Sequence, residues 1–285
     1  MLLKKTAEIV EIIDPWLQLQ NGNRVFTTLE GENPGGSMKD HMVHGEIEDL
    51  WQKNLLKNGS GISEVSAGST AASLAYYCPL YGLKCVLFVP PAAPLHLLNS
   101  LQKQGAEIHV EEMSSIYGAY DSFTSQHPEL HRFDQLFDNS KRRYYHSLGA
   151  EVLNSLGRID AIIGSVGTGH SLLGTAEGMG RPFTISAEPE SPLRIPGVRN
   201  VEADRYGEKD TCQAKDFDLR MIVTATDLPP AINVLTTVGL VQIPVSFQLV
   251  LAGLKNYLNN KKNLQVFAVG ASLKPLEKLS LKQAA

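Results

Sequence analysis

The sequence of 285 residues lacks several features that mark specialised protein classes. It contains only three cysteines, Cys78, Cys85 and Cys212, and none of them belongs to a Cys-x-x-Cys pair. This spacing argues against a disulfide framework and against a zinc site, so we expect reduced thiols in a cytoplasmic protein without a metal. No internal repeat or low-complexity segment stands out.

Long apolar runs and strong charge are also missing. No window approaches the roughly 18 uninterrupted apolar residues of a membrane-spanning helix. The opening MLLKKTAEIVEII is interrupted by Glu8 and Glu11, so we do not expect a secretory signal there. The net charge is -4, and the one dense basic run, KRR at 141–143, is interpreted as a solvated turn. We therefore expect neither a membrane nor a nucleic-acid partner.

Short apolar runs that alternate with helix-like segments make up most of the sequence. KCVLFV at 84–89 predicts a strand, LHLLNSLQKQG a helix and AEIHVEE the next strand. Further buried strands are predicted at 159–166, 183–189 and 264–270. Unbroken apolar strands joined by helices are typical of parallel sheets covered on both faces, so we predict an α/β fold. The length allows one large or two modest domains.

The segment at 190–220 interrupts this alternation. It is polar and rich in proline, glycine and charge. Inside a compact domain, such a segment is either a functional loop or disordered, and the sequence leaves both alternatives open.

Three loops of small residues lie where a predicted helix begins. In the first, ENPGGSMKDHM at 32–42, Pro-Gly and Gly-Gly mark a turn, and Lys39 follows at the start of a helix. One interpretation makes Ser37 the N-cap, Asp40 a first-turn carboxylate and Lys39 a solvated surface charge. The other gives the Lys39 amine a chemical task, and this loop alone does not decide between them.

The second loop lies in SEVSAGSTAASLAYY at 63–77 and leads into a helix near Thr70. Its N–H groups and the hydroxyls of Ser66, Ser69 and Thr70 could bind an anion at the positive end of that helix. Alternatively, its small residues only allow the helix to pack closely on the sheet.

The third loop, GSVGTGHSLLG at 164–174, again connects a predicted strand to a helix. Gly167 and Gly169 could begin the Gly-x-Gly-x-x-Gly motif of a dinucleotide site, but the third glycine would fall at position 172, which is Leu172. No P-loop motif is present either. What remains is a cup of N–H groups with the hydroxyls of Thr168 and Ser171, which suits a single phosphate monoester.

Taken together, the three loops provide a phosphate cup, an anion site and a lysine at a loop-to-helix junction. An enzyme that uses pyridoxal 5'-phosphate needs a binding site for the phosphate, an amine that reacts with the aldehyde and a binding site for the carboxylate of the amino acid substrate. The combination therefore predicts a pyridoxal-phosphate site.

These residues resemble the fold-type II pyridoxal-phosphate enzymes, and within them the cysteine synthase (O-acetylserine sulfhydrylase) and cystathionine β-synthase group. The resemblance is collinear from about residue 20 to 255, and it is carried by LEGENPGGSMKDHM, SAGSTAASLA, LFDNSKRRYYH, GSVGTGHSLLG and ISAEPESPLRIPGV. It implies two three-layer α/β/α domains with a cofactor cleft between them. Residues 1–39 and 146–285 would form the larger cofactor-binding domain, and 40–145 a smaller, mobile substrate domain.

The resemblance also implies a role for each site residue. Lys39 would be the catalytic residue, both as the Schiff-base lysine of pyridoxal 5'-phosphate and as the general base. The other cofactor-binding residues would be Ser69, Gly167, Thr168, Gly169, His170, Ser171 and Ser246. The substrate-binding residues would be Ser66, Ala67, Gly68, Thr70 and Gln135. The implied reaction is β-replacement or β-elimination on a serine- or cysteine-type amino acid, first of all O-acetylserine with sulfide, in a cytoplasmic homodimer.

The sequence departs from the family at several of these positions. Ser69 replaces an asparagine, His170 a glycine and His41 an arginine, and only Ser246 lies near the place of a Ser-Ser-Gly. The departures leave an alternative open, in which the protein acts on another β-substituted amino acid or is a scaffold that has lost catalysis. Retention of Lys39 and of the cup argues against that loss. Structural or surface roles are expected for the individual histidines His41, His44, His146 and His170.

Overall fold

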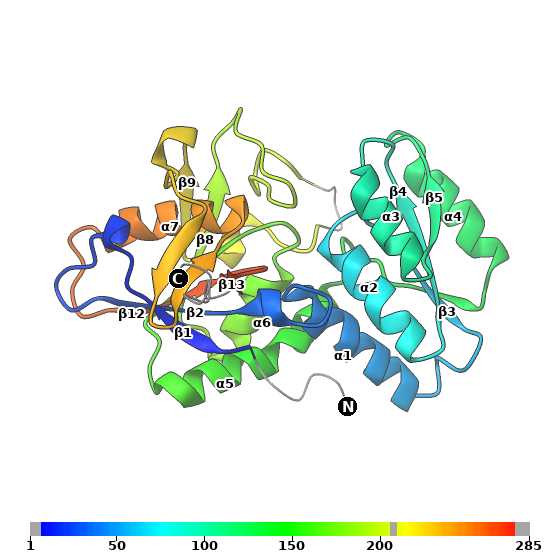
Figure 1. Ribbon diagram of the computed structural model, residues 1–285, viewed down its shortest axis with the longest axis horizontal. Coiled ribbons are helices and arrows are strands. Elements are labelled where there is room, and N and C mark those ends of the chain that lie inside the picture. Colours follow the sequence, from blue (N-terminus) through cyan, green and yellow to red (C-terminus); the bar gives the residue numbers. More distant parts are fainter. Residues whose placement is uncertain (1–6, 206–209, 277–285) are drawn as a thin grey trace, which may run out of the picture.

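Two sheets organise the chain in a computed structural model that describes residues 7–205 and 210–276. Within these residues, strands from both ends of the sequence form a nine-stranded sheet, and strands from the middle form a four-stranded sheet. Figure 1 shows the two sheets side by side, the larger one on the left and the smaller one on the right. The predicted α/β class is confirmed.

The larger sheet has the order β13-β11-β10-β1-β2-β12-β7-β8-β9. Its strands are β1 (Ile9–Ile12), β2 (Arg24–Thr28), β7 (Ala161–Ser165), β8 (Phe183–Pro189), β9 (Leu219–Val223), β10 (Asn233–Thr236), β11 (Gly239–Gln242), β12 (Gln265–Val269) and β13 (Lys274–Pro275). The run from β2 through β12, β7 and β8 to β9 is parallel, as expected from the apolar strands. The edge from β1 to β13 is antiparallel, and the sequence had not indicated it.

The smaller sheet is parallel throughout, with the order β5-β4-β3-β6. Its strands are β3 (Gly61–Val65), β4 (Lys84–Val89), β5 (Glu107–Val110) and β6 (Leu130–Arg132). The α-helices are α1 (Lys39–Gln52), α2 (Ser69–Leu80), α3 (Leu95–Lys103), α4 (Ile116–Gln126), α5 (His146–Leu156), α6 (His170–Gly178) and α7 (Val245–Leu258). Short 3-10 helices are η1 (Pro15–Leu17), η2 (Glu30–Glu32), η3 (Asn139–Tyr145), η4 (Ala214–Asp216) and η5 (Ala225–Asp227).

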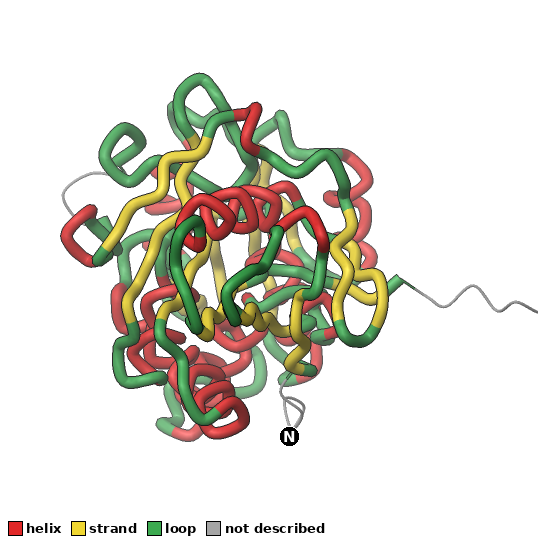
Figure 2. Tube along the Cα trace, turned by 90° about the vertical axis from the view of Figure 1, so that its left-hand side faces the viewer, coloured by secondary structure: helices red, strands yellow, loops and turns green. Residues whose placement is uncertain are grey.

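Alternation along the strands explains the layers. In β4, Val86 and Phe88 pack towards α4, whereas Leu87 joins the core on the side of α2. In β7, Ile162 faces α5 and α6, and Ile163 faces α7. Both sheets are thus covered on two faces, and Figure 2 shows helices on both sides of the strands of the larger sheet. One hydrophobic core cluster is shared by the two sheets, since it contains residues of β3 and β4 from the smaller sheet and of β7 and β12 from the larger sheet.

The smaller sheet takes its strands from residues 61–132, and the larger sheet takes its strands from residues 9–28 and 161–275. The proposed boundaries at 39/40 and 145/146, and the mobility of the smaller domain, stay predictions.

The interpretation of the basic run as a solvated turn is wrong. Lys141 is 1% exposed, its ammonium forms an ion pair with the buried Glu46, and it lies 4.1 Å above the centre of the Phe133 ring. Arg142 is also mostly covered and donates a hydrogen bond to the carbonyl oxygen of Thr211. Charge composition alone cannot reveal such burial, because the compensating carboxylate comes from a distant helix.

Candidate active site

The loop that carries Lys39 is fastened to α2 by the residue after the lysine. The buried carboxylate of Asp40 accepts hydrogen bonds from the N–H of Gly35 at 2.6 Å and from the hydroxyl of Ser73 at 2.5 Å. Gly35 has no room for a side chain, since a Cβ there would overlap this carboxylate. The hydroxyl of Ser37 accepts the N–H of Lys39 at 3.2 Å, but the N-cap of α1 is Met38 and not Ser37, so the prediction of Ser37 as N-cap is wrong by one residue. The first residue of α1 is therefore held in a fixed place.

The side chain of Lys39 is half-buried, so its interpretation as a solvated surface charge is wrong. Its Nζ lies 3.5 Å from Oε1 of Gln135. Burial lowers the pKa of the Lys39 amine to about 8, and the nearby carboxylate of Glu64 counteracts part of that effect. An amine with this pKa has a much larger neutral fraction at pH 7 than an ordinary lysine, and a neutral amine can act as nucleophile or base.

Gln135 joins the three loops that the sequence had singled out. Its Oε1 accepts a hydrogen bond from the hydroxyl of Thr70 at 2.8 Å and another from the Lys39 amine at 3.5 Å. Its backbone carbonyl oxygen accepts Nε2–H of His170 at 2.7 Å. The lysine loop, the anion loop and the glycine cup therefore meet around one residue, which follows β6 at the end of the smaller sheet.

The anion loop presents N–H groups at the start of α2. Ser66 and Ala67 are half-buried, whereas Gly68 and Ser69 are exposed. The N–H of Gly68 points back to the hydroxyl of Ser66 at 3.3 Å. Within the described residues, the N–H groups of Ser69, Thr70 and Ala71 have no hydrogen-bond acceptor, as expected for the first turn of a helix. An anion can use these donors.

The glycine cup has the same character at the start of α6. Gly169 adopts φ +79°, a conformation that glycine reaches without a steric penalty. A Cβ on Gly167 would overlap the carbonyl oxygen of Gly197. Across the described chain, none of the N–H groups from Gly167 to Ser171 donates to a protein acceptor. The cup is therefore a concave set of free donors at the positive end of a helix, which is a favourable place for a phosphate.

His170 is fully buried behind the cup and is electrically neutral. Burial and the charge of Lys39 lower the pKa of its imidazole to about 3. Because Nε2 faces the carbonyl oxygen of Gln135, the proton lies on Nε2 and leaves Nδ1 as an acceptor. This Nδ1 is buried without a hydrogen-bond partner among the described residues. The imidazole thus supplies no charge to the cup and instead connects it to the loop of Gln135.

The remaining predicted positions lie outside this set of contacts. Ser246 is half-buried in the first turn of α7, and no hydrogen bond within the described residues joins it to the cluster. The imidazole of His41 lies 3.0 Å from a carboxylate oxygen of the buried Glu30. His44 contacts the hydroxyl of Tyr81, and His146 contacts Glu177 at the surface. These three histidines have the structural or surface environments expected for them.

Three residues that the sequence analysis had missed contact the site. Glu64 is buried, and its two carboxylate oxygens accept the N–H groups of Val65 at 2.8 Å and Gln135 at 3.1 Å. Burial raises the pKa of this carboxyl to about 7. The sequence did offer a signal for Glu64, because a glutamate inside an apolar strand directly before the anion loop indicates a buried carboxylate near the site. Arg199 and Thr211 bind carbonyl groups of the cup from the 190–220 segment, and only the tertiary structure could show this.

The described parts of that segment therefore pack against the cup, whereas 206–209 lies outside the described residues. This packing favours the functional-loop alternative for residues 190–205 and 210–220.

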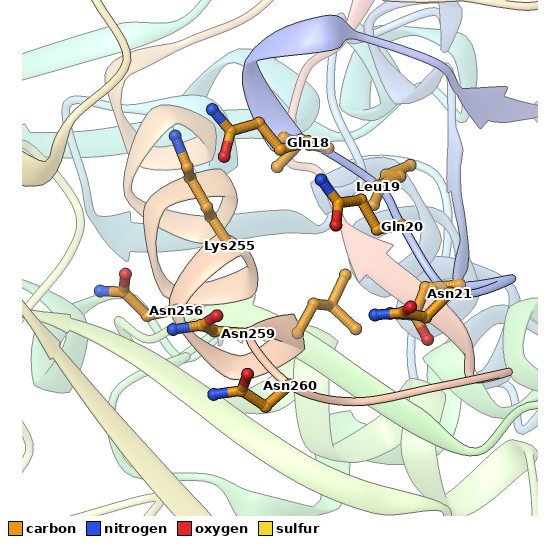
Figure 3. A pocket seen from close by; sticks show the side chains of 11 residues that line it. Gln18, Leu19, Gln20, Asn21, Lys255, Asn256, Asn259 and Asn260 are labelled. Carbon is orange, nitrogen blue, oxygen red and sulfur yellow. The ribbon is translucent and has the colours of Figure 1, made fainter.

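A cavity of about 280 Å³ lies away from these loops, between the loop after η1 and the end of α7. Figure 3 shows that amide side chains dominate it, among them Gln18, Gln20, Asn21, Asn256 and Asn259, with Lys255 at one side. It contains none of the predicted site residues.

In residues 7–205 and 210–276, no helix combines the length and apolar character needed to cross a bilayer. The same residues contain no group of three or more histidine, cysteine, aspartate or glutamate side chains that could hold a metal.

Comparison with known proteins gives consistent relatives. Residues 15–237 match the model of a family described as "Pyridoxal-phosphate dependent enzyme". A cysteine synthase from Staphylococcus aureus is 32% identical over 214 residues, which cover 69% of each chain. An O-acetylserine dependent cystathionine β-synthase from Bacillus subtilis is 31% identical over 183 residues, or 60% of each chain. The crystal structure of a hydrogen sulfide-producing enzyme from Fusobacterium nucleatum shares the fold, with a TM-score of 0.78, 18% identity and 93% coverage of both chains.

Proposed function

Because the chain belongs to the family of pyridoxal-phosphate dependent enzymes, we propose that it catalyses β-replacement or β-elimination on a serine- or cysteine-type amino acid. O-acetylserine and sulfide are the first substrates to test, since the relatives include cysteine synthases and an O-acetylserine dependent cystathionine β-synthase. The observation that carries the proposal is the meeting of Lys39, Thr70 and His170 around Gln135.

Three features of the site support a fit to the cofactor. The amine of Lys39 would bind its aldehyde, and the free N–H groups from Gly167 to Ser171 would hold its phosphate. Neither glycine of the cup has space for a side chain, so the backbone itself can approach the phosphate. When bound, pyridoxal phosphate supplies an aldehyde for amines and a ring that withdraws electrons from the Cα atom of an amino acid. The sequence also offers Ser69 and Ser246 as contacts to its ring.

Lys39 would act as the general base at Cα of the substrate. With a pKa of about 8, roughly one amine in ten is neutral at pH 7, compared with about one in three thousand for a lysine with the ordinary pKa of 10.5. Oε1 of Gln135 lies next to Nζ and orients the amine by accepting a hydrogen bond. Removal of the α-proton allows a leaving group on Cβ to depart, and a nucleophile such as sulfide can then add at Cβ.

The anion loop would bind the carboxylate of the amino acid. The donors are the unpaired N–H groups at the start of α2, with Ser66, Ala67, Gly68 and Thr70 forming the loop. Gln135 contributes its Nε2, which has no acceptor in the part of the chain that the structure describes. A bound carboxylate at this place would put Cα within the same cluster as the Lys39 amine.

Attachment of the cofactor provides the first test. Purified protein is expected to be yellow, and borohydride reduction is expected to fix the cofactor on the tryptic peptide that contains Lys39. The variant Lys39→Ala is expected to lose this label, whereas Lys53→Ala is a matched control at the exposed end of the same helix. Label on any other lysine would refute the assignment.

Turnover provides the second test. Cofactor absorbance is followed with O-acetylserine, O-phosphoserine, serine and cysteine, and cysteine formation is measured with O-acetylserine plus sulfide. A spectral change with at least one of the four amino acids is expected. If the protein binds cofactor through Lys39 and responds to none of them, the proposed reaction is wrong and a non-catalytic role is favoured.

One observation favours a second candidate, in which the β-substituted substrate is larger. Ser69 is exposed at the start of α2, and its short side chain makes no hydrogen bond within the described residues. The space around it would accept a bulkier amino acid. By resemblance we also propose a cytoplasmic homodimer, which sedimentation of the purified protein and cell fractionation would test.

A further inference from the structure

Two side chains from the 190–220 segment donate hydrogen bonds to backbone carbonyl oxygens of the cup. Nε of Arg199 donates to the carbonyl oxygen of Gly167 at 2.7 Å. The hydroxyl of Thr211 donates to the carbonyl oxygen of Thr168, also at 2.7 Å. Both partners are buried, and they lie more than thirty positions further along the chain than the carbonyl groups that they hold.

The geometry of the peptide bond gives these contacts a second effect. In a planar trans peptide, the C=O and the next N–H point in opposite directions. The carbonyl of Gly167 shares its plane with the N–H of Thr168, and the carbonyl of Thr168 shares its plane with the N–H of Gly169. Fixing both carbonyls on the side of Arg199 and Thr211 therefore aims both N–H groups to the opposite side.

Without such contacts, this loop would have unusual freedom. Glycines flank Thr168 on both sides, and glycine opposes rotation of a peptide plane less than any other residue. We propose that Arg199 and Thr211 are positioning residues, which hold the N–H groups of Thr168 and Gly169 ready for the cofactor phosphate. This inference rests on the proposed function, because it assigns the cup to that phosphate.

The positioning residues are themselves fixed. The guanidinium of Arg199 is 3% exposed and forms a two-point ion pair with the buried Asp210, with one of the two contacts at 2.7 Å. It also donates to the backbone carbonyl oxygens of Asp204 and Cys212. The carbonyl oxygen of Thr211 accepts a hydrogen bond from Arg142. A guanidinium suits this task because it has five N–H donors in one rigid plane.

Thr211 allows a matched pair of variants. Thr211→Val keeps the shape and removes the hydroxyl, whereas Thr211→Ser keeps the hydroxyl and removes a methyl group. Each apoprotein is titrated with pyridoxal phosphate, and inorganic phosphate is measured as a competitor of that binding. We expect the valine variant to bind both molecules about tenfold more weakly, and the serine variant to stay within about twofold of the wild type.

Inorganic phosphate separates the cup from the lysine. It has no aldehyde, so its affinity depends on the N–H groups and not on Lys39. The ³¹P NMR shift of the bound cofactor adds a spectroscopic signature, which is expected to move in the valine variant and not in the serine variant. A role in stability alone would lower the unfolding midpoint and leave both phosphate readouts unchanged, which would overturn the proposal.

The remaining outcomes are also decisive. Equal weakening in the serine and valine variants would overturn the proposal, because the hydroxyl would then not be responsible. If the valine variant does not fold, Arg199→Lys takes its place, and unchanged phosphate affinity there would overturn the proposal. Wild-type protein that binds no pyridoxal phosphate would refute the proposed function and this inference together. Wild-type binding combined with an unaffected valine variant would refute this inference alone.

Discussion

The two ends of α6 offer a sharp test of the glycine cup. Gly169 precedes this helix and Gly180 follows it, and both have φ +79°. A Cβ on Gly169 would lie 2.8 Å from Sγ and 2.9 Å from Cβ of Cys212, whereas a Cβ on Gly180 meets nothing within 4 Å. Alanine at the two positions therefore introduces the same backbone strain, and only one of the variants adds a steric clash at the site.

The expected magnitudes follow from this difference. A left-handed conformation costs an ordinary residue about 1–2 kcal/mol. Forcing an extra methyl group into a packed core adds about 1–3 kcal/mol. We therefore expect Gly180→Ala to lower the free energy of unfolding by about 1–2 kcal/mol and Gly169→Ala to lower it by about 2–5 kcal/mol.

Cofactor affinity is expected to separate the variants further. Where Cys212 stays in place, relief of the clash displaces the peptide group between Thr168 and Gly169, and the N–H of this group is one of the free donors of the cup. Loss of one such hydrogen bond to a charged phosphate weakens binding by about tenfold or more. Gly180→Ala lies outside the cup and is expected to bind the cofactor like the wild type.

Urea unfolding of the apoproteins and an absorbance titration with pyridoxal phosphate measure both quantities. Equal unfolding free energies of the two variants would show that Cys212 moves aside without penalty. Equal cofactor affinities, with Gly169→Ala folded and less stable than Gly180→Ala, would refute the assignment of the cup to the phosphate.

Three further predictions concern charge and the departures from the family. Glu64→Gln removes the carboxylate that raises the pKa of Lys39, so the pH at which the apoprotein takes up the cofactor is expected to fall; an unchanged pH profile would contradict the pairing. Ser69→Asn separates the two candidates: turnover of O-acetylserine that rises about ten- to a hundredfold supports the loss of a family contact, whereas slow turnover together with loss of the best substrate of the wild type supports a pocket for a larger one. If neither Ser69→Asn nor Ser69→Ala changes any rate or the cofactor spectrum, residue 69 does not face the cofactor. Burial lowers the pKa of His41, but the hydrogen bond and charge of Glu30 outweigh this and raise it above 6.5. The stability that this pair contributes is complete below the ordinary pKa of 6.5 and is lost as the pH rises through the raised value. The unfolding free energy of the wild type is therefore expected to fall as the pH rises above 6.5, and a similar fall in His41→Gln would exclude the pair as its cause.

Local sequence was sufficient for the elements that carry the site. The runs at 84–89, 183–189 and 264–270 predicted β4, β8 and β12, because strands buried on both faces are mainly apolar, although β8 also buries Thr184, Ser186 and Glu188. Glycine and serine before a helix likewise predicted the loops that begin α2 and α6, since the first turn of a helix leaves its N–H groups unpaired.

Tertiary structure decided which of these elements act together. Gln135 forms hydrogen bonds to residues 96, 65 and 35 positions away. The family resemblance had named it as a substrate-binding residue, but no local pattern predicted that it would join the three loops. Local sequence also did not predict the burial of Lys141, whose charge is compensated by Glu46 from a distant helix. Nor did it predict the hydrogen bond from Arg199 to the carbonyl oxygen of Gly167 in the cup. Periodicity and turn chemistry arise between neighbours in the chain, and they therefore fix helices, strands and loops. Burial, pKa and the direction of a peptide plane depend on groups that only folding brings together, so the electrostatics and the preorganisation of this site belong to the three-dimensional structure.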